Sequence, residues 1–127
     1  MRTGLWISLL LLGVTIALGW WEICENRALS QRYVSASEEM RILTDMQDWP
    51  RAEEVVSAYI EEWQRTVPWL QILINHEDID DVTLALVKLQ AAIQAQKQSA
   101  CYEACAELKE NARHIHHRGA LTLGNVL

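Results

Sequence analysis

Hydrophobic residues follow two different patterns along the chain. From Thr3 to Trp21 the sequence carries no charge and is almost entirely apolar. From residue 29 onward, apolar residues instead recur every three or four positions, with polar and charged residues between them. This spacing places side chains on one face of an α-helix, and the alternation typical of a half-buried strand is absent. The pattern predicts an all-α chain.

Four stretches carry the helical spacing, and each predicts one apolar stripe to be buried against neighbouring helices. The four stripes are Leu29, Tyr33, Ala36, Met40 and Leu43; Val56, Ile60, Trp63, Val67, Leu70 and Ile74; Val82, Leu86, Leu89 and Ile93; and Cys101, Cys105, Leu108, Ala112 and Ile115. Because only short connections separate them, we predict an up-and-down antiparallel bundle of about four helices. No turn signal separates the apolar run from the first stripe, so one long helix is expected to enter the bundle.

Several residues mark the expected helix ends. Asp48 followed by Pro50 is typical of a helix start, and Ser99 is placed to cap the fourth helix. Pro68 lies inside the second stripe, and we expect a kink there because the apolar spacing continues in phase beyond it. Gly119 is the expected C-cap of the fourth helix, with the apolar tail after it folding back on the bundle.

The apolar run is long enough to cross a membrane, which takes ~20 residues. Trp20 and Trp21 close it, where aromatic side chains favour the headgroup layer. We therefore predict a membrane anchor (a signal-anchor) at residues 1–21, in contact with lipid through residues 3–21, and an extracytoplasmic helical bundle at residues 22–127. Arg2 precedes the run, which by the positive-inside rule places the amino terminus in the cytoplasm of a single-pass cell-membrane protein. Small residues at 17–19 leave open a cleaved signal peptide and a secreted domain.

The charge and the motifs of the sequence limit the classes of function and the partners that we expect. The net charge is −6 and no basic stripe is interleaved with aromatics, so nucleic acid is not an expected partner. An acidic domain is repelled by anionic lipid, so a second membrane-surface site is not expected. No nucleophile elbow, phosphate loop or HExxH motif occurs, and we expect neither an enzyme nor a cofactor. Cys24, just after the apolar run, leaves open an intermolecular disulfide and a homo-oligomer.

The stretch LINHEDIDDV, residues 73–82, gathers one histidine and four acids. The spacing lacks the mid-loop glycine and terminal glutamate of an EF-hand. Asx residues and acids in the first turn are instead what a helix start needs. The stretch is therefore interpreted as the beginning of the third helix, with His76 in the turn before it.

Two further groups of residues suggest binding. Cysteines and histidines near the end of the chain suggest zinc binding. Against this interpretation, both thiols lie on the apolar stripe, and the histidines follow about two turns later. The cluster consists of Cys101, Cys105, His114, His116 and His117. Aromatics on or near the second helix have two interpretations, core packing and a partner-facing patch. The partner-binding candidates are Trp49, Trp63, Trp69 and His76.

The segment WLQILINHEDIDDVTLALVKLQAAIQAQ and the ending LTLGNVL resemble a family of small membrane-anchored proteins from clostridia and their relatives, known as domain of unknown function 4363. The matching positions are Trp63, Trp69, His76, Ile79, Asp80, Leu121, Asn125 and Val126. The resemblance implies a membrane-bound helical module of a Gram-positive bacterium. It implies no reaction.

The hypothesis that follows is a single-pass membrane protein whose extracytoplasmic helical bundle binds or scaffolds another membrane or envelope protein. One alternative is an extracytoplasmic domain that senses a ligand or a metal. The other is a secreted helical domain released by signal cleavage.

Overall fold

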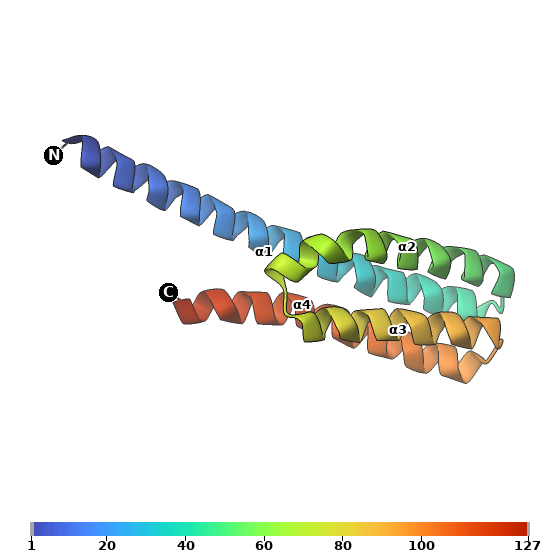
Figure 1. Cartoon of the computed structure of the whole chain (residues 1–127). Coiled ribbons are helices and arrows are strands. Elements are labelled where there is room, and N and C mark those ends of the chain that lie inside the picture. Colours follow the sequence, from blue (N-terminus) through green and yellow to red (C-terminus); the bar gives the residue numbers. More distant parts are fainter. Residues whose placement is uncertain (1, 127) are drawn as a thin grey trace.

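The computed structural model describes the backbone of residues 2–126 and the side chains of residues 2–72 and 74–115. Across this part of the chain the elements are α1 (Arg2–Asp45), α2 (Trp49–Leu73), α3 (His76–Gln94) and α4 (Gln98–Val126). They form an antiparallel up-and-down bundle from which the amino-terminal half of α1 projects (Figure 1). The predicted fold class and the single long first helix are both confirmed.

The core is built from the four predicted stripes. Every member of the third and fourth stripes is buried, and the first and second stripes are buried or half-buried. Trp63, Tyr33 and Met40 are the largest fully enclosed side chains. α1 packs most extensively on α4, and its contact with α2 is the thinnest between neighbouring helices. The bundle therefore has one loosely closed side, between α1 and α2.

The apolar half of α1 lies outside this core. Its most apolar 18-residue window has no buried residue, and the helix is long and apolar enough to span a membrane. Leu10 and Trp20 are each 68 % exposed. The first buried residue of α1 is Asn26, so the bundle begins a few residues after the apolar run ends.

The start and the proline of α2 agree with the sequence. A carboxylate oxygen of Asp48 accepts a hydrogen bond from the amide of Arg51 at 3.4 Å, and Pro50 lies in the first turn. α2 continues through Pro68 to Leu73, and its last turns leave the axis of the rest of the helix (Figure 1). Proline lacks the amide that would bond the carbonyl one turn earlier, which accounts for a bend without a stop.

Three expected helix boundaries are wrong. α4 begins at Gln98, so Ser99 lies within its first turn; the amide of Cys101 bonds the carbonyl of Lys97 at 3.0 Å. Gly119 does not end α4, and the tail does not fold back, because the helix runs on to Val126. A glycine inside a helix costs only about 1 kcal/mol, which the surrounding turns can absorb. His76 is not in the turn either but is the first residue of α3.

The loops between α1 and α2 and between α3 and α4 close in the same way. Gln47 and Gln96 both have φ of 53°, in the left-handed region. The amide of Gln96 bonds the carbonyl of Ile93, and the next amide bonds the carbonyl of Ala92, each at 3.0 Å. This is the Schellman arrangement, in which glycine is the usual left-handed residue. Each loop therefore holds a glutamine in a conformation that L-residues adopt at a cost.

Gln96→Gly is expected to stabilise the protein by about 0.5–1 kcal/mol. The left-handed conformation costs an L-residue about 1–2 kcal/mol, and the greater freedom of glycine in the unfolded chain offsets part of that gain. Urea unfolding of the full chain in mild detergent, followed by circular dichroism, measures the change. The matched control is Gln31→Gly in the exposed interior of α1, which should instead destabilise by about 1 kcal/mol. Equal destabilisation by both variants would contradict the strain at Gln96.

Candidate functional site

The predicted metal-binding residues do not converge in the described part of the chain. Cys101 and Cys105 are buried in the core, 0 % and 4 % exposed. Burial raises the pKa of both thiols, that of Cys105 to about 12, so they remain protonated and are poor metal ligands near neutral pH. His114 is exposed and lies 3.5 Å from Glu110. Among the described residues no group of three metal-ligating side chains occurs, and the side chains of His116 and His117 lie outside them.

The aromatic candidates separate into core and surface. Trp63 is 1 % exposed, and its indole Nε1 donates a hydrogen bond to Thr83 Oγ1 at 2.8 Å. Trp63 therefore agrees with the core-packing interpretation and presents almost no surface for a partner to contact. Trp49 is half-buried against the core, whereas Trp69 is 74 % exposed. His76 is exposed at the start of α3.

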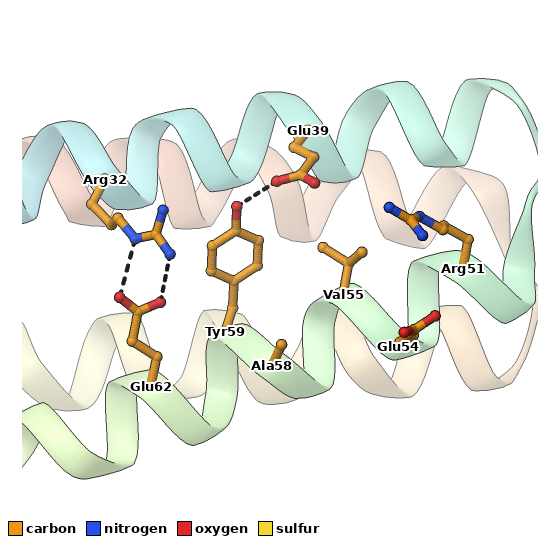
Figure 2. A pocket seen from close by; sticks show the side chains of 8 residues that line it. All are labelled: Arg32, Glu39, Arg51, Glu54, Val55, Ala58, Tyr59 and Glu62. Atoms are coloured by element: carbon orange, nitrogen blue, oxygen red, sulfur yellow. Dashed lines mark hydrogen bonds and ion pairs between the residues drawn. The ribbon is translucent and has the colours of Figure 1, made fainter.

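A shallow polar hollow of about 260 Å³ opens on the loosely closed side of the bundle, and we call it the α1–α2 hollow (Figure 2). Its lining consists of Arg32, Glu39, Arg51, Glu54, Val55, Ala58, Tyr59 and Glu62. Val55 and Ala58 provide apolar surface, while the other side chains carry charge or a hydroxyl. The hollow therefore combines charges of both signs and an aromatic ring with a small apolar surface.

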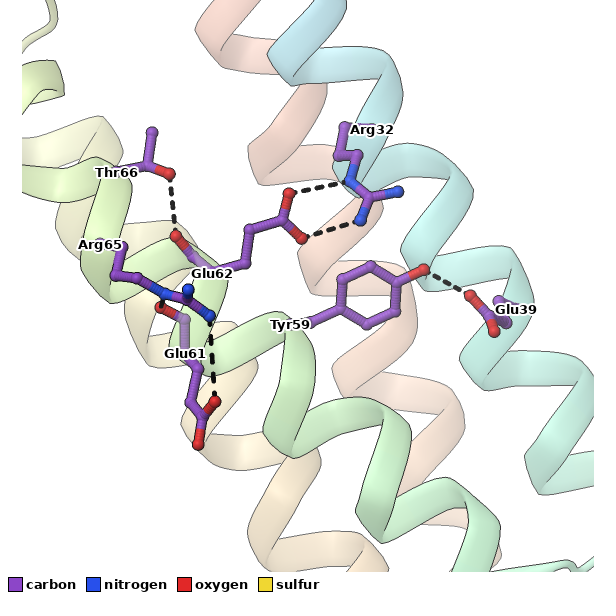
Figure 3. Close-up of polar contacts among 7 residues, drawn as sticks. All are labelled: Arg32, Glu39, Tyr59, Glu61, Glu62, Arg65 and Thr66. Carbon is purple, nitrogen blue, oxygen red and sulfur yellow. Dashed lines mark hydrogen bonds and ion pairs between the residues drawn. The ribbon is translucent and has the colours of Figure 1, made fainter.

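A network of polar contacts fixes one end of the α1–α2 hollow (Figure 3). The Arg32 guanidinium donates two hydrogen bonds to Glu62, at 3.1 and 2.8 Å, and lies 5.4 Å from the centre of the Tyr59 ring. The Tyr59 hydroxyl donates to a carboxylate oxygen of Glu39. Burial and this hydrogen bond raise the pKa of Tyr59 to about 12, so the phenol stays neutral. The arginine and the tyrosine are thus held in place by contacts within the chain.

At the other end of the hollow lie two charged side chains that have no partner among the described residues. The side chains of Arg51 and Glu54 are exposed and make no hydrogen bond or ion pair to the described residues. In Figure 2 they lie beyond Val55, on the side of the hollow away from Arg32. These two charges are therefore available to a molecule that enters the hollow.

A second, apolar groove lies nearer the projecting half of α1. Because that half is long and apolar enough to span a membrane, we call this the juxtamembrane groove. Its volume is about 620 Å³. Its lining comes from the point where α1 leaves the bundle and from the last turns of α2: Leu18, Trp21, Glu22, Glu25, Asn26, Leu29, Thr66, Trp69 and Leu70. The exposed Trp69 is thus part of a concave surface that also includes residues of the apolar run.

The sequence pattern singled out Trp69 but missed the α1–α2 hollow. Arg32, Glu39 and Glu62 have no local signature, since they are ordinary charged residues on helices that carry many. Only the pairing of side chains between the two helices, Arg32 with Glu62 and Glu39 with Tyr59, distinguishes them from a solvated surface. That pairing depends on the register of α1 against α2.

The fold and these surfaces define a class: an all-α four-helix bundle continuous with an apolar amino-terminal helix. The chain belongs to the family described as domain of unknown function (DUF4363), whose model matches residues 25–126. The match begins where α1 enters the core, so the family domain coincides with the bundle. Searches of curated proteins and of solved structures gave no match.

Proposed function

We propose that this chain is a single-pass membrane protein whose bundle lies outside the cytoplasm and binds another membrane or envelope protein through the α1–α2 hollow. The main support is the hollow itself. There the side chains of Arg51 and Glu54 have no partner among the described residues, and the Arg32–Tyr59 pair is already held in place. Arginine and tyrosine are among the residue types that dominate binding energy at protein interfaces.

The proposed role is binding rather than catalysis. The carboxylates of Glu39 and Glu62 are occupied by Tyr59 and Arg32, and the lining of the hollow includes no serine, cysteine or histidine. Charges of both signs favour a partner segment that presents an acid toward Arg51 and a base toward Glu54. Such complementarity gives specificity and a defined register.

The membrane part of the proposal is supported by the exposed apolar half of α1. Its side chains have no protein surface to cover them in the described chain, and lipid is the medium in which such a helix is stable. The proposal places the amino terminus in the cytoplasm because Arg2 directly precedes the run.

Site-specific photo-cross-linking in native membranes tests the binding face. A photoreactive amino acid at Ala58, in the hollow, should trap a distinct partner that the same group at Ala91, exposed on α3, does not trap. Arg51→Glu should lower the yield at least about tenfold, because a hydrogen bond to a charged group contributes about 1.5–3 kcal/mol. Arg65→Glu, an equal charge reversal outside the hollow, should leave the yield unchanged. Products that do not depend on Arg51 would contradict the proposed face.

Orientation is measured in the same cells. Cys24 is exposed whereas Cys101 and Cys105 are buried, so a membrane-impermeant maleimide should label only Cys24 of the folded protein. Labelling of intact cells that disappears in Cys24→Ser supports an external bundle. Labelling only after the cells are permeabilised would show the opposite orientation, with the bundle in the cytoplasm.

A further inference from the structure

The juxtamembrane groove lies at the level where the apolar half of α1 ends. α2 runs antiparallel to α1, and the ion pair between Arg32 and Glu62 marks residues that face each other across the two helices. Two turns beyond Glu62, Trp69 faces the same groove as Trp21, the last residue of the apolar run. Figure 1 shows α1 diverging from the bundle beside the end of α2, so the groove lies in the fork between them.

Helix geometry places this fork within the headgroup layer of a bilayer. Residues 3–21 rise by roughly 28 Å, close to the ~30 Å hydrocarbon thickness. The headgroup layer adds about 5–7 Å on each side, which corresponds to the next four or five residues of α1. Leu18 and Trp21 would then lie in or at the edge of the hydrocarbon, with Glu22, Glu25 and Asn26 among the headgroups.

The end of α2 has the side chains that such a layer favours. Trp69 is 74 % exposed and Ile72 is 76 % exposed, although both are large and apolar. Trp21, which is 62 % exposed, lines the same groove as Trp69, and the neighbouring Trp20 is 68 % exposed. Tryptophan prefers the membrane interface because its ring is amphipathic. Exposed tryptophans from both helices therefore meet at this groove, Trp21 from α1 and Trp69 from α2.

We propose that the end of α2 docks on the bilayer and that the juxtamembrane groove holds a zwitterionic lipid of the adjacent leaflet. The inference rests on the membrane anchor of the proposed function. The groove is continuous with the apolar surface of α1, so the lipid that surrounds the anchor extends into it without another partner. The acyl chain contacts Leu18, Trp69 and Leu70.

The charges of the groove determine the headgroup. Glu22 and Glu25 are the charged residues in its lining. Two carboxylates repel an anionic phosphate and attract the amine or choline group of a zwitterionic lipid. The proposed site departs from the expectation that the acidic domain has no second membrane-surface site, because repulsion by acids applies to anionic lipid only. Apolar contact and the aromatic rings hold the end of α2 at the bilayer, and the two carboxylates select the headgroup.

Fluorescence quenching in vesicles tests the docking. The full chain, with Cys24→Ser to remove the exposed thiol, is labelled with an environment-sensitive fluorophore at Ile72→Cys, Ile42→Cys or Leu12→Cys. Ile42 is a matched control, because it is also an exposed isoleucine (58 %) and lies near the far end of α1. In phosphatidylcholine vesicles, lipids with a nitroxide near the headgroup should quench the label at position 72 but not at 42. Trp69→Glu should remove the quenching at 72.

The label at position 12 separates the two proposals. Deep nitroxide lipids should quench it if α1 spans the bilayer; no quenching there would overturn the membrane anchor itself. Quenching at 12 with none at 72 would overturn only the docking. Replacing phosphatidylcholine by phosphatidylglycerol should weaken quenching at 72 and leave it unchanged at 12. A blue shift at 72 that grows with the protein-to-lipid ratio, without quenching, would show a second copy in the groove and overturn the lipid assignment.

Discussion

Trp63→Ala is expected to destabilise the bundle by about 4 kcal/mol, a large part of the total stability of a small domain. Trp63 is 1 % exposed and lies at the meeting point of three helices. Its ring packs edge-on against Tyr33, with centroids 4.9 Å apart, and its indole bonds Thr83 on α3. The substitution removes this packing and leaves a cavity that the surrounding helices can only partly fill. Urea unfolding of the full chain in mild detergent measures the loss.

Trp69→Ala is the matched control, because it makes the same change in the same helix at a side chain that is 74 % exposed. It should change stability by less than about 0.5 kcal/mol. Trp63→Phe should give an intermediate loss, since it keeps a ring but removes the donor to Thr83. Similar losses for Trp63→Ala and Trp69→Ala would contradict the burial of Trp63.

The second large effect is a loss of stability at alkaline pH that depends on Cys105. Burial raises the pKa of this thiol from 9.0 to about 12 in the folded protein. The folded state therefore retains the proton above pH 9, where the unfolded chain releases it. The stability from this group is fully present below about pH 9 and is lost as the pH rises toward 12. At pH 11 the loss is about 2–3 kcal/mol, since each pH unit in this window contributes about 1.4 kcal/mol.

Comparison of variants isolates this contribution from that of other groups that titrate at high pH. Tyr59, whose pKa is raised to about 12, also lowers the stability of the protein as the pH rises. It is present in every variant, so its contribution is the same in all of them. Unfolding free energies between pH 8 and pH 11 should fall less steeply for Cys105→Ala than for the unchanged chain. Cys24→Ala, which removes an exposed thiol, should leave the slope as it was. Parallel slopes for all three proteins would show that Cys105 ionises normally.

Much of the fold could be predicted because the spacing of apolar residues within each helix determines which face is buried. Leu86 and Leu108 illustrate this, since each lies on a predicted stripe and is at most 1 % exposed. The ends of α3 and α4 were harder to predict. Gln96 takes the left-handed position usually held by glycine, and Gly119 lies within α4. The expectation that a glycine ends a helix was therefore wrong at Gly119 and gave no signal at Gln96.

The surfaces were predictable only in part. Trp69 was a candidate from its residue type, but the sequence could not separate it from Trp63, six residues earlier on the same helix. The structure separates them by burial, 74 % against 1 % exposed. The α1–α2 hollow depends on which charged residue of one helix meets which of the other. No periodicity within a single helix contains that information.

α1 runs without a break from Arg2 to Asp45, so the proposed anchor and one quarter of the bundle move as a single rod. Residues 22–45 extend roughly 36 Å beyond the apolar run. Transmembrane helices tilt by about 20° on average, and a tilt of that size would carry the far loops sideways by roughly 12 Å. A bilayer that changes thickness would thus swing the bundle across the membrane surface. Lipid contact at Trp69 would hold α1 close to the point where it leaves the bilayer, and would thereby limit this sideways motion of the bundle.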